Sequence, residues 1–387
     1  MPKTWRQVRI GGVCVVNPLR PKKQEERVTF LGMADVSEEG RLINPNIVDY
    51  TKVSKGFTPF ERGDILVAKI TPCFENGKGA DTNALPTQQG YGSTEFHVLR
   101  CKDVDRRYMF LHTMSYEFRK KLESEMTGSA GQKRVQTESV ASYLLGLPSA
   151  DEQQRIAEIL TVQDKAIELK EKLMAEKQRQ KKYLMQQLLT GKKRLPGFAG
   201  EWKTDKLGNL FAERVETKCE HMELLAITGT QGVIPRSWLD LKDNSSDDKS
   251  KYLHICIGDI GYNTMRMWQG VSAYSNYEGI VSPAYTILKP KEDICAKYFS
   301  YLFKLPEVVF LFYRFSQGLV DDTRNLKYEN FKKIKVKFPI EKREQEAISK
   351  VLETADKEID LLQRDLEQEK QKKKALMQLL LPGIVRV

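Results

Sequence analysis

The sequence of 387 residues lacks several features that mark common protein classes. It has no run of about 18 apolar residues, and Met1 to Trp5 contain no signal-peptide core, so neither a membrane span nor export is expected. The six cysteines are scattered without a Cys-x-x-Cys pair, which predicts reduced, mostly buried thiols rather than disulfides or a zinc site. We therefore expect a cytoplasmic protein.

Catalytic motifs are also missing. Gly77-Lys78 and Gly191-Lys192 lack the earlier glycine of a phosphate loop, and no dinucleotide-binding glycine fingerprint occurs. Asn17-Pro18 is not followed by the Pro-aromatic pair of amino-methyltransferases, and no acidic pair followed by Glu-x-Lys indicates a nuclease. Metal-ligand spacing with Cys, Asp or Glu is absent around the four histidines: His97, His112, His221 and His254. The sequence predicts no catalytic residue, cofactor or metal in this chain.

The composition is that of a globular protein with a basic balance. Hydrophobic residues make up 40% of the chain and charged residues 30%. Lys plus Arg number 63 against 52 Asp plus Glu, a formal net charge of +11. This excess favours a polyanionic partner such as nucleic acid, although some of it lies on expected helices, where it is compatible with a merely solvated face.

A stretch of 44 residues occurs twice. Residues 152–195 align with residues 344–387 at a constant offset of 192 without a gap, and 17 of the 44 aligned positions are identical. Each copy contains no Gly or Pro up to residue 189 or 381, and a glycine comes soon after, Gly191 or Gly383, where a helix is expected to end. The repeat predicts two related long helices.

Each copy carries apolar side chains at alternating spacings of four and three residues, the pattern of a coiled-coil seam. The seam positions of the second copy are Ile348, Leu352, Ala355, Ile359, Leu362, Leu366, Glu369, Lys373, Leu376 and Leu380. The more polar first seam is Ile156, Leu160, Gln163, Ile167, Lys170, Met174, Lys177, Lys181, Leu184 and Leu188. A helix of roughly 60 Å with so narrow a seam requires a partner. We expect the two copies to pair as an antiparallel coiled coil.

The segments before the helices repeat more faintly. Trp5 to Gly11 matches Trp202 to Gly208, and Gly63-Asp64-Ile65 matches Gly258-Asp259-Ile260. Apolar or alternating runs predict strands at 28–32, 65–70, 95–99, 255–257 and 285–288. Helices are expected at 108–125 and 296–315. The predicted fold class is α+β: mixed α/β domains at 1–147 and 202–337, helical regions at 148–191 and 338–387, and a linker at 192–201.

Side chains suited to nucleic acid recur at equivalent places in both halves. Arg, Lys, Asn and Gln contact base edges, and further Lys and Arg neutralise phosphates. In the first half they are Lys69, Thr71, Lys78, Lys133 and Arg134. In the second half they are Asn263, Arg266, Gln269, Arg324 and Asn325. Taken singly, each fits an exposed charge better than a base contact, and Arg134 and Arg324 fit a structural role equally well. Their recurrence favours a nucleic-acid interface.

The layout resembles the DNA specificity subunit of Type I restriction-modification systems. The resemblance rests on two diverged globules, each with Trp-x4-[Ile/Leu]-Gly and Gly-Asp-Ile, and on the repeated Glu-Gln-x2-Ile helix with its Lys-Lys-x-Leu-Met-Gln. It covers essentially the whole chain, and the helical repeat is its most specific part. It implies two target-recognition domains that each read one half of a bipartite, asymmetric site in double-stranded DNA. It also implies that the helices set the unspecified spacer.

The resemblance further implies partners. Two modification subunits would bring S-adenosylmethionine and methylate adenine, and restriction subunits would add ATP- and Mg-dependent activity, so this chain would be non-catalytic. The modification subunits would dock on helix faces left over from the seam, near Lys181, Leu184, Met185, Lys373, Leu376 and Met377. Two other readings stay open: a self-contained DNA-modifying or DNA-cleaving enzyme, and a coiled-coil scaffold without a nucleic-acid role.

Overall fold

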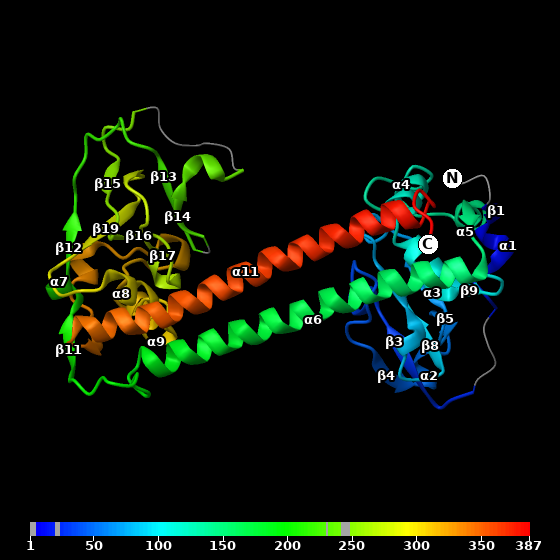
Figure 1. The fold of residues 1–387 in the computed structure, drawn as a ribbon, viewed down its shortest axis with the longest axis horizontal. Helices are drawn as coiled ribbons and strands as arrows, with labels where there is room; N and C mark the ends of the chain where they lie inside the picture. The colour runs from blue at the N-terminus through cyan, green and yellow to red at the C-terminus, as the bar shows by residue number, and fades with distance from the viewer. Residues whose placement is uncertain (1–4, 20–23, 230, 241–247) are drawn as a thin grey trace. The chain divides into compact units, whose positions relative to one another are not determined.

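The computed structural model describes residues 5–19, 24–229, 231–240 and 248–387. The chain divides into two compact units, unit 1 (Met1–Glu171 and Asp365–Val387) and unit 2 (Lys172–Arg364). Each unit therefore contains a globular part and a portion of both long helices (Figure 1). Within the described ranges, no helix combines the length and apolar character needed to cross a membrane.

Two four-stranded sheets form the globular part of unit 1. The first has the order β2-β9-β6-β7 with antiparallel neighbours; the second has the order β4-β3-β8-β5, in which β3 and β8 are parallel. A separate pair, β1 and β10, is also antiparallel. The strands are β1 Arg6–Arg9, β2 Cys14–Val16, β3 Arg27–Leu31, β4 Asn46–Asp49, β5 Thr58–Glu61, β6 Ile65–Ala68, β7 Gly79–Asp81, β8 Gln89–Gly92, β9 Phe96–Cys101 and β10 Leu144–Leu147. The helices are α1 Ile10–Val13, η1 Met33–Asp35, α2 Tyr50–Val53, η2 Thr82–Ala84, α3 Arg106–Thr113, α4 Tyr116–Glu123 and α5 Thr137–Ser142.

Unit 2 repeats this plan. Its antiparallel sheet β12-β19-β16-β17 matches β2-β9-β6-β7 strand for strand, and β11 pairs with β20 as β1 pairs with β10. The second sheet is looser, because its two antiparallel pairs, β13-β14 and β15-β18, are joined among the described residues by one parallel bridge, between Leu224 and Ile280. The strands are β11 Trp202–Lys206, β12 Phe211–Arg214, β13 Leu225–Thr228, β14 Gly232–Pro235, β15 Leu253–Ile255, β16 Ile260–Asn263, β17 Ser272–Tyr274, β18 Gly279–Val281, β19 Tyr285–Pro290 and β20 Lys335–Pro339. The helices are α7 Leu207–Leu210, η3 Arg236–Trp238, η4 Met267–Gln269, α8 Ala296–Leu302, α9 Pro306–Phe315, η5 Asp321–Thr323 and α10 Tyr328–Phe331.

The expected strands are confirmed at β3, β6, β9, β15 and β19, with ends shifted by at most two residues. The two helices expected at 108–125 and 296–315 are each broken in two. Ser115 ends the first because its side chain accepts a hydrogen bond from the Phe118 N–H and starts α4 as an N-cap. Pro306 breaks the second because it lacks an amide hydrogen and stands at the first position of α9.

The long helices are confirmed: α6 spans Ala150–Leu188 and α11 spans Lys342–Leu380, 39 residues each. Both end in the same backbone motif. Gly191 and Gly383 each have φ near +72°, and each donates its N–H to a carbonyl three residues earlier. Glycine is required there because other residues rarely adopt that left-handed conformation.

The helices run antiparallel inside each unit. In unit 1 the ion pairs are Asp164–Lys373 (2.5 Å) and Lys170–Asp365 (2.6 Å). The residue number increases along α6 while that of its partner on α11 decreases. In unit 2 the pairs Lys177–Glu358 (2.8 Å) and Lys181–Asp356 follow the same order. Every seam position of both helices is buried or partly buried, so the predicted seam is confirmed.

Both ends of the helices enter the globular cores. In unit 1, Ile156 and Leu160 near the start of α6 share a core with Leu380 at the end of α11. In unit 2, Leu188 at the end of α6 shares a core with Ile348 near the start of α11. The predicted boundaries at 147 and 201 coincide with the end of β10 and the start of β11, whereas contacts group each globule with portions of both helices.

The cysteines differ in part from expectation. All six are free, but only Cys14 is buried and the other five are partly exposed. The prediction of mostly buried thiols is therefore wrong, because most of these residues lie at strand ends and in loops. Cys14 and Cys101 face each other across β2 and β9 with their sulfur atoms 3.5 Å apart.

Candidate nucleic-acid interface

Two loops meet in unit 1 at the place where the sequence predicts DNA contacts. The loop after β6 and the Gly-led loop at 127–134 are joined by backbone hydrogen bonds: the Thr71 N–H donates to the Lys133 carbonyl (3.0 Å) and the Val135 N–H to the Lys69 carbonyl (2.9 Å). The structure thus brings Lys69, Thr71, Lys133 and Arg134 together. Lys78 lies at the far end of the loop, where its ammonium group donates to the Met33 carbonyl (2.9 Å).

Arg134 is held by its own unit. Its guanidinium donates to both carboxylate oxygens of Glu95 at 2.9 to 3.2 Å, and this partner raises the pKa of Arg134. The Thr71 hydroxyl donates to the Glu75 carboxylate (3.2 Å). Lys133, by contrast, is exposed, and its ammonium group has no polar partner among the residues that the structure describes. Lys69 is partly buried. Lys133 is therefore the side chain of this set with the greatest freedom to meet an external anion.

A polar support lies beneath these loops. The buried His97 ring contacts the Val135 carbonyl through Nε2 (2.9 Å) and the Asn17 amide through Nδ1 (3.2 Å). Burial lowers the pKa of His97, so the ring is neutral, with Nε2 donating to the carbonyl and Nδ1 accepting from the amide. Asn17 also donates to the Thr137 hydroxyl (3.1 Å). This network fixes the backbone that carries Arg134.

Unit 2 has the corresponding loop pair. The Leu326 N–H donates to the Thr264 carbonyl (2.8 Å), as Val135 does to Lys69. Bridges Thr127↔Arg134 and Gln317↔Asn325 close the Gly-led loops, so the second loop is one residue longer and Asn325, rather than Arg324, occupies the place of Arg134. The extra residue lies inside the loop, so Arg324 takes the place of Lys133.

The predicted residues of unit 2 fall into two groups. Arg266 and Gln269 are exposed, and their side chains have no polar partner within the described ranges. Asn263 accepts the Met265 N–H (2.9 Å), and the Asn325 amide donates to the Thr323 carbonyl (3.3 Å), so both mainly shape their loops. Arg324 stands apart from both groups, because it contacts the aromatic ring of Tyr313.

Arg324 is anchored on an aromatic ring. Its guanidinium lies 4.1 Å from the Tyr313 ring centroid and donates to the Tyr313 hydroxyl and the Asp321 carboxylate, both at 2.9 Å. Tyr313 stacks on Phe310, whose side chain is 58% exposed, and meets Trp268 edge to face. Sequence reasoning missed Phe310 and Tyr313, because aromatic residues of a helix next to a globule normally indicate a core.

A buried cation supports each loop from inside. In unit 1, Arg119 donates to the Phe74 (3.0 Å) and Gly77 (3.3 Å) carbonyls, and burial lowers its pKa to about 9. In unit 2, Lys304 donates to the Gly270 (2.7 Å) and Ser272 (2.6 Å) carbonyls, and burial lowers its pKa to about 8. The two halves use different residues for the same task.

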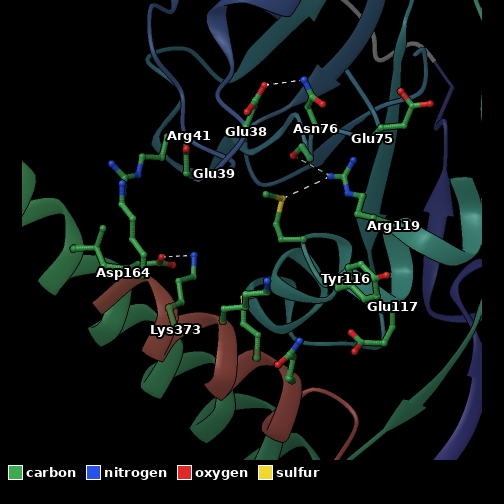
Figure 2. A pocket seen from close by; sticks show the side chains of 17 residues that line it. Glu38, Glu39, Arg41, Glu75, Asn76, Tyr116, Glu117, Arg119, Asp164 and Lys373 are labelled. Carbon is green, nitrogen blue, oxygen red and sulfur yellow. Dashed lines mark hydrogen bonds and ion pairs between the residues drawn. The ribbon is translucent and has the colours of Figure 1, made fainter. Parts of the chain in front are cut away.

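Another concave region of unit 1 is lined by charged side chains of both signs. It has a volume of about 580 Å³ and lies between the globular part and the helices (Figure 2). Glu38, Glu75 and Glu117 contribute carboxylates to its lining, and Asp164 of α6 pairs with Lys373 of α11 at its edge. The lining also contains basic side chains, so charges of both signs meet there and the region carries no clear preference for phosphates: Arg41, Arg119, Lys370, Lys373 and Lys374.

The residues predicted to bind partner subunits do not lie on free helix faces. Lys181 pairs with Asp356, and Lys373 with Asp164, across the antiparallel helices. The four apolar residues pack on the cores of their own units: Leu184, Met185, Leu376 and Met377. The expected outward placement is therefore wrong, because the seam recruits these side chains; their partner-binding role stays a prediction.

Comparison with known proteins shows the family to which this architecture belongs. A family model described as "Type I restriction modification DNA specificity domain" matches residues 2–177 and 201–370. The chain belongs to this family. Each match covers one globular part and most of the long helix that follows it, which is the repeat seen in the sequence.

Individual relatives agree with the family assignment. Over 160 residues, 40% of this chain, it is 37% identical to the EcoAI and 35% identical to the EcoEI Type I restriction enzyme specificity subunits of Escherichia coli. Each alignment spans 27% of the length of that relative. The shared segment is therefore a minor part of either E. coli protein.

Solved structures show the same fold over the full chain. The S subunit of a Type I restriction-modification system from M. genitalium has a TM-score of 0.60 at 14% identity, covering 99% of this chain and 98% of that one. The HsdS subunit from Thermoanaerobacter tengcongensis has a TM-score of 0.51 at 18% identity, covering 100% and 98% respectively. Members of the family thus keep this arrangement although few residues are identical.

Proposed function

We propose that the chain is the DNA-binding specificity subunit of a Type I restriction-modification complex, in which each globular part reads one half of a bipartite, asymmetric site in double-stranded DNA. The observation that carries the proposal is the duplicated specificity domain with unlike exposed side chains on its corresponding pairs of loops. Unit 1 presents Lys133 on its Gly-led loop, and unit 2 presents Arg266 and Gln269 on the loop after β16. One scaffold with two different surfaces suits the reading of two different half-sites.

The chemistry of these side chains divides their roles. Lys133 and the partly buried Lys69 are suited to phosphates, since an ammonium group is a point charge without base preference. Arg266 and Gln269 can make paired hydrogen bonds to guanine and adenine edges. The exposed rings of Phe310 and Tyr313 add apolar surface beside them. The remaining predicted DNA contacts act in this proposal by holding the loops in shape.

The long helices act as the spacer. Each has 39 residues without interruption, about 58 Å at 1.5 Å per residue. Half-sites on one face of B-DNA are separated by about 34 Å per helical turn, so helices of this length suit a bipartite target. Insertion of one helical turn into both helices should lengthen the preferred spacer; an unchanged spacer would remove the ruler role.

Two modification subunits and the restriction subunits complete the proposed complex. In it, the partners carry S-adenosylmethionine, ATP and Mg, this chain supplies no catalytic residue, and the location is cytoplasmic. A docking face is available on α6, where apolar side chains off the seam recur at spacings of three and four residues. Those at least 37% exposed are Ile159, Val162, Leu169 and Leu173.

Docking on this face can be tested by co-purification with the modification subunits of the same system. The double variant Val162→Asp/Leu169→Asp should not co-purify, because charged side chains would replace apolar ones on the docking face. Both side chains are more than half exposed, so they contribute little to the fold of the chain. Arg155→Ala, an exposed position on the same helix, serves as the matched control and should co-purify normally. Co-purification of the double variant at the wild-type level would move the docking face elsewhere.

DNA reading is tested by fluorescence anisotropy with random duplexes and by selection of bound sequences from a random pool, using the chain alone and with its modification subunits. The proposal predicts affinity that falls steeply with salt and two enriched sequence blocks separated by a fixed gap. Salt-insensitive or absent binding would favour a scaffold. DNA modification or cleavage by the purified chain without any partner would favour a self-contained enzyme.

A further inference from the structure

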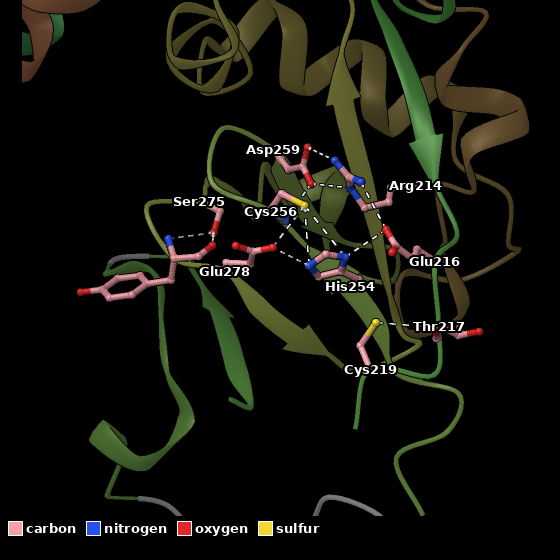
Figure 3. A network of polar contacts seen from close by, with 10 residues as sticks. Arg214, Glu216, Thr217, Cys219, His254, Cys256, Asp259, Ser275 and Glu278 are labelled. Atoms are coloured by element: carbon pink, nitrogen blue, oxygen red, sulfur yellow. Dashed lines mark hydrogen bonds and ion pairs between the residues drawn. The ribbon is translucent and has the colours of Figure 1, made fainter. Parts of the chain in front are cut away.

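Three kinds of metal-binding donor converge in unit 2 (Figure 3). Side chains alternate along a strand, so His254 in β15 and Cys256 two residues later lie on the same face. β15 pairs antiparallel with β18, with His254 opposite Ile280 and Ile255 opposite Gly279, so the next register position sets Cys256 opposite Glu278. Strand geometry therefore gathers an imidazole, a thiol and a carboxylate.

The distances among these donors are short. The Cys256 Sγ lies 3.7 Å from His254 Nε2, the Glu278 Oε1 lies 3.0 Å from the same nitrogen, and Sγ and Oε1 are 4.0 Å apart. Zinc bonds of about 2.3 Å to sulfur and about 2.0 to 2.1 Å to nitrogen and oxygen, at tetrahedral angles, give separations of about 3.3 to 3.5 Å. Each observed separation lies within about 0.5 Å of that range.

The other ring nitrogen is already oriented. His254 Nδ1 lies 2.9 Å from the Glu216 carboxylate, and the imidazole is 8% exposed. A histidine that binds a metal through one nitrogen commonly donates the other N–H to a carboxylate, which fixes the tautomer and raises the basicity of the ligand. Glu216 is placed to accept that proton.

The turn that carries Cys256 is held in place from both sides. The Asp259 carboxylate accepts the Cys256 N–H (2.9 Å) and is itself paired with Arg214 (2.7 Å). Unit 1 has the same turn, in which Asp64 accepts the Glu61 N–H (2.7 Å), but there the Glu61 side chain pairs with Arg100. The position equivalent to Cys256 thus carries an ion-paired carboxylate in unit 1 and a thiol beside a histidine in unit 2.

We propose that unit 2 binds one zinc ion through His254 Nε2, the Cys256 thiolate and the Glu278 carboxylate, with Glu216 holding His254 Nδ1–H. A thiolate and an imidazole select zinc over magnesium or calcium, which prefer oxygen ligands. The fourth position is open to water. Cys219 forms a second donor group with Glu216 and His254 on the other side of the ring, within 4.8 Å of each, and its thiol donates to the Thr217 carbonyl (3.7 Å). The proposal assigns the ion to the Cys256 side, where His254 Nε2 also meets Glu278 (3.0 Å), and leaves Cys219 outside the ligand set.

The test uses the full chain, reduced and freed of metal. Zinc titration against a chromophoric competitor should give one equivalent bound, and Co²⁺ should produce thiolate-to-metal charge-transfer absorption. Cys256→Ser should abolish that absorption and weaken zinc binding at least tenfold. Cys219→Ser, in the same unit, and Cys73→Ser, in unit 1, are matched controls that should leave both readouts unchanged.

Folding is checked separately. Wild type and Cys256→Ser should melt at the same temperature without zinc, and only the wild type should melt higher when zinc is added. If Cys256→Ser does not fold, Glu278→Gln replaces it with the same expected loss of zinc affinity. Absence of stoichiometric zinc binding by the wild type would overturn the proposal. Loss of the cobalt signal in Cys219→Ser but not in Cys256→Ser would overturn it as well.

Discussion

The two units share the same scaffold contacts and differ in the loop side chains that they expose to solvent. The fourth residue of each long helix is a Gln whose side chain accepts the backbone N–H of the N-cap residue of another helix. The Asp105 N–H of α3 donates to Gln153 (2.8 Å), and the Cys295 N–H of α8 donates to Gln345 (2.9 Å). The loops above the sheets share backbone hydrogen bonds but little sequence. Scaffold positions are thus restrained by packing, whereas loop side chains are free to diverge.

The two units form the same Arg–Glu ion pair at the helix ends but differ in the contact of the neighbouring Trp indole. Arg194 after α6 pairs with Glu344 at the start of α11 (2.5 Å), and Arg386 pairs in the same way with Glu152. Glu152 also accepts the Trp5 indole N–H (3.2 Å), whereas the corresponding Trp202 Nε1 is buried without a partner among the described residues. The carboxylate of unit 1 therefore has a second donor that the carboxylate of unit 2 lacks.

The largest effect is expected from Arg194→Ala. The Glu344 side chain has no exposed surface, so loss of its cation leaves a buried charge unpaired and lowers the free energy of unfolding by about 3 kcal/mol. Arg386→Ala should cause a smaller loss, because Glu152 keeps the Trp5 hydrogen bond. Urea unfolding of both variants measures this, with exposed Lys192→Ala as the control. Equal losses would show that the indole contact contributes nothing.

A second difference is buried His112, the seventh residue of α3; the seventh residue of α8 in unit 2 is the buried Leu302. Burial lowers the pKa of His112 to about 4 from 6.5, so the unfolded chain binds more protons than the folded chain between these values. The free energy of unfolding is therefore highest above pH 6.5 and falls by up to about 3 kcal/mol as the pH decreases toward 4.

His112→Leu should remove that loss. Unfolding free energies at pH 7 and pH 4.5 should differ less in the variant than in the wild type, and hydrogen exchange should locate the difference in unit 1. His221→Leu, an exposed histidine of unit 2, is the control and should behave as wild type. An unchanged pH dependence in His112→Leu would mean that the buried imidazole is not the acid-sensitive group.

The Gly-led loops give a smaller, graded effect. Gly318 has φ +129°, and a Cβ there would lie 2.6 Å from the Thr323 carbonyl oxygen; Gly128 has φ +128°, with 2.9 Å to the Gln132 carbonyl oxygen. Gly318→Ala should cost about 2 kcal/mol and Gly128→Ala about 1 kcal/mol. Thermal melts measure both. Gly12→Ala, which meets nothing within 4 Å, should be close to neutral, and a larger loss for Gly128→Ala than for Gly318→Ala would contradict this ranking.

The smallest effect expected is that of a single phosphate contact. Lys133→Ala should weaken DNA binding by about 1 kcal/mol for all sequences and reduce the salt slope by about one. Anisotropy titrations at several salt concentrations measure this. Glu138→Ala, exposed nearby in α5, should not reduce the affinity or the slope. A Lys133→Ala variant with wild-type slope would place this side chain outside the interface.

The helices and their pairing could be predicted from the sequence because periodic apolar positions over 39 residues and a repeated terminal glycine are strong local signals. The site could be predicted only as a region. The Glu95 partner of Arg134 and the Tyr313 partner of Arg324 depend on tertiary contacts that no local pattern reveals. Sequence reasoning missed the proposed zinc donors: His254-x-Cys256 puts two of them on one strand face, but the third, Glu278, is brought there only by the strand register.

The central claim is that each globular part reads its own half-site. The most direct test is sequence selection from a random DNA pool with the wild type, a Lys69→Ala/Lys133→Ala variant and an Arg266→Ala/Gln269→Ala variant, each with its modification subunits. The account predicts two conserved blocks, with the first variant weakening or relaxing only one of them and the second variant only the other. One contiguous block, or two variants that relax the same block, would contradict it.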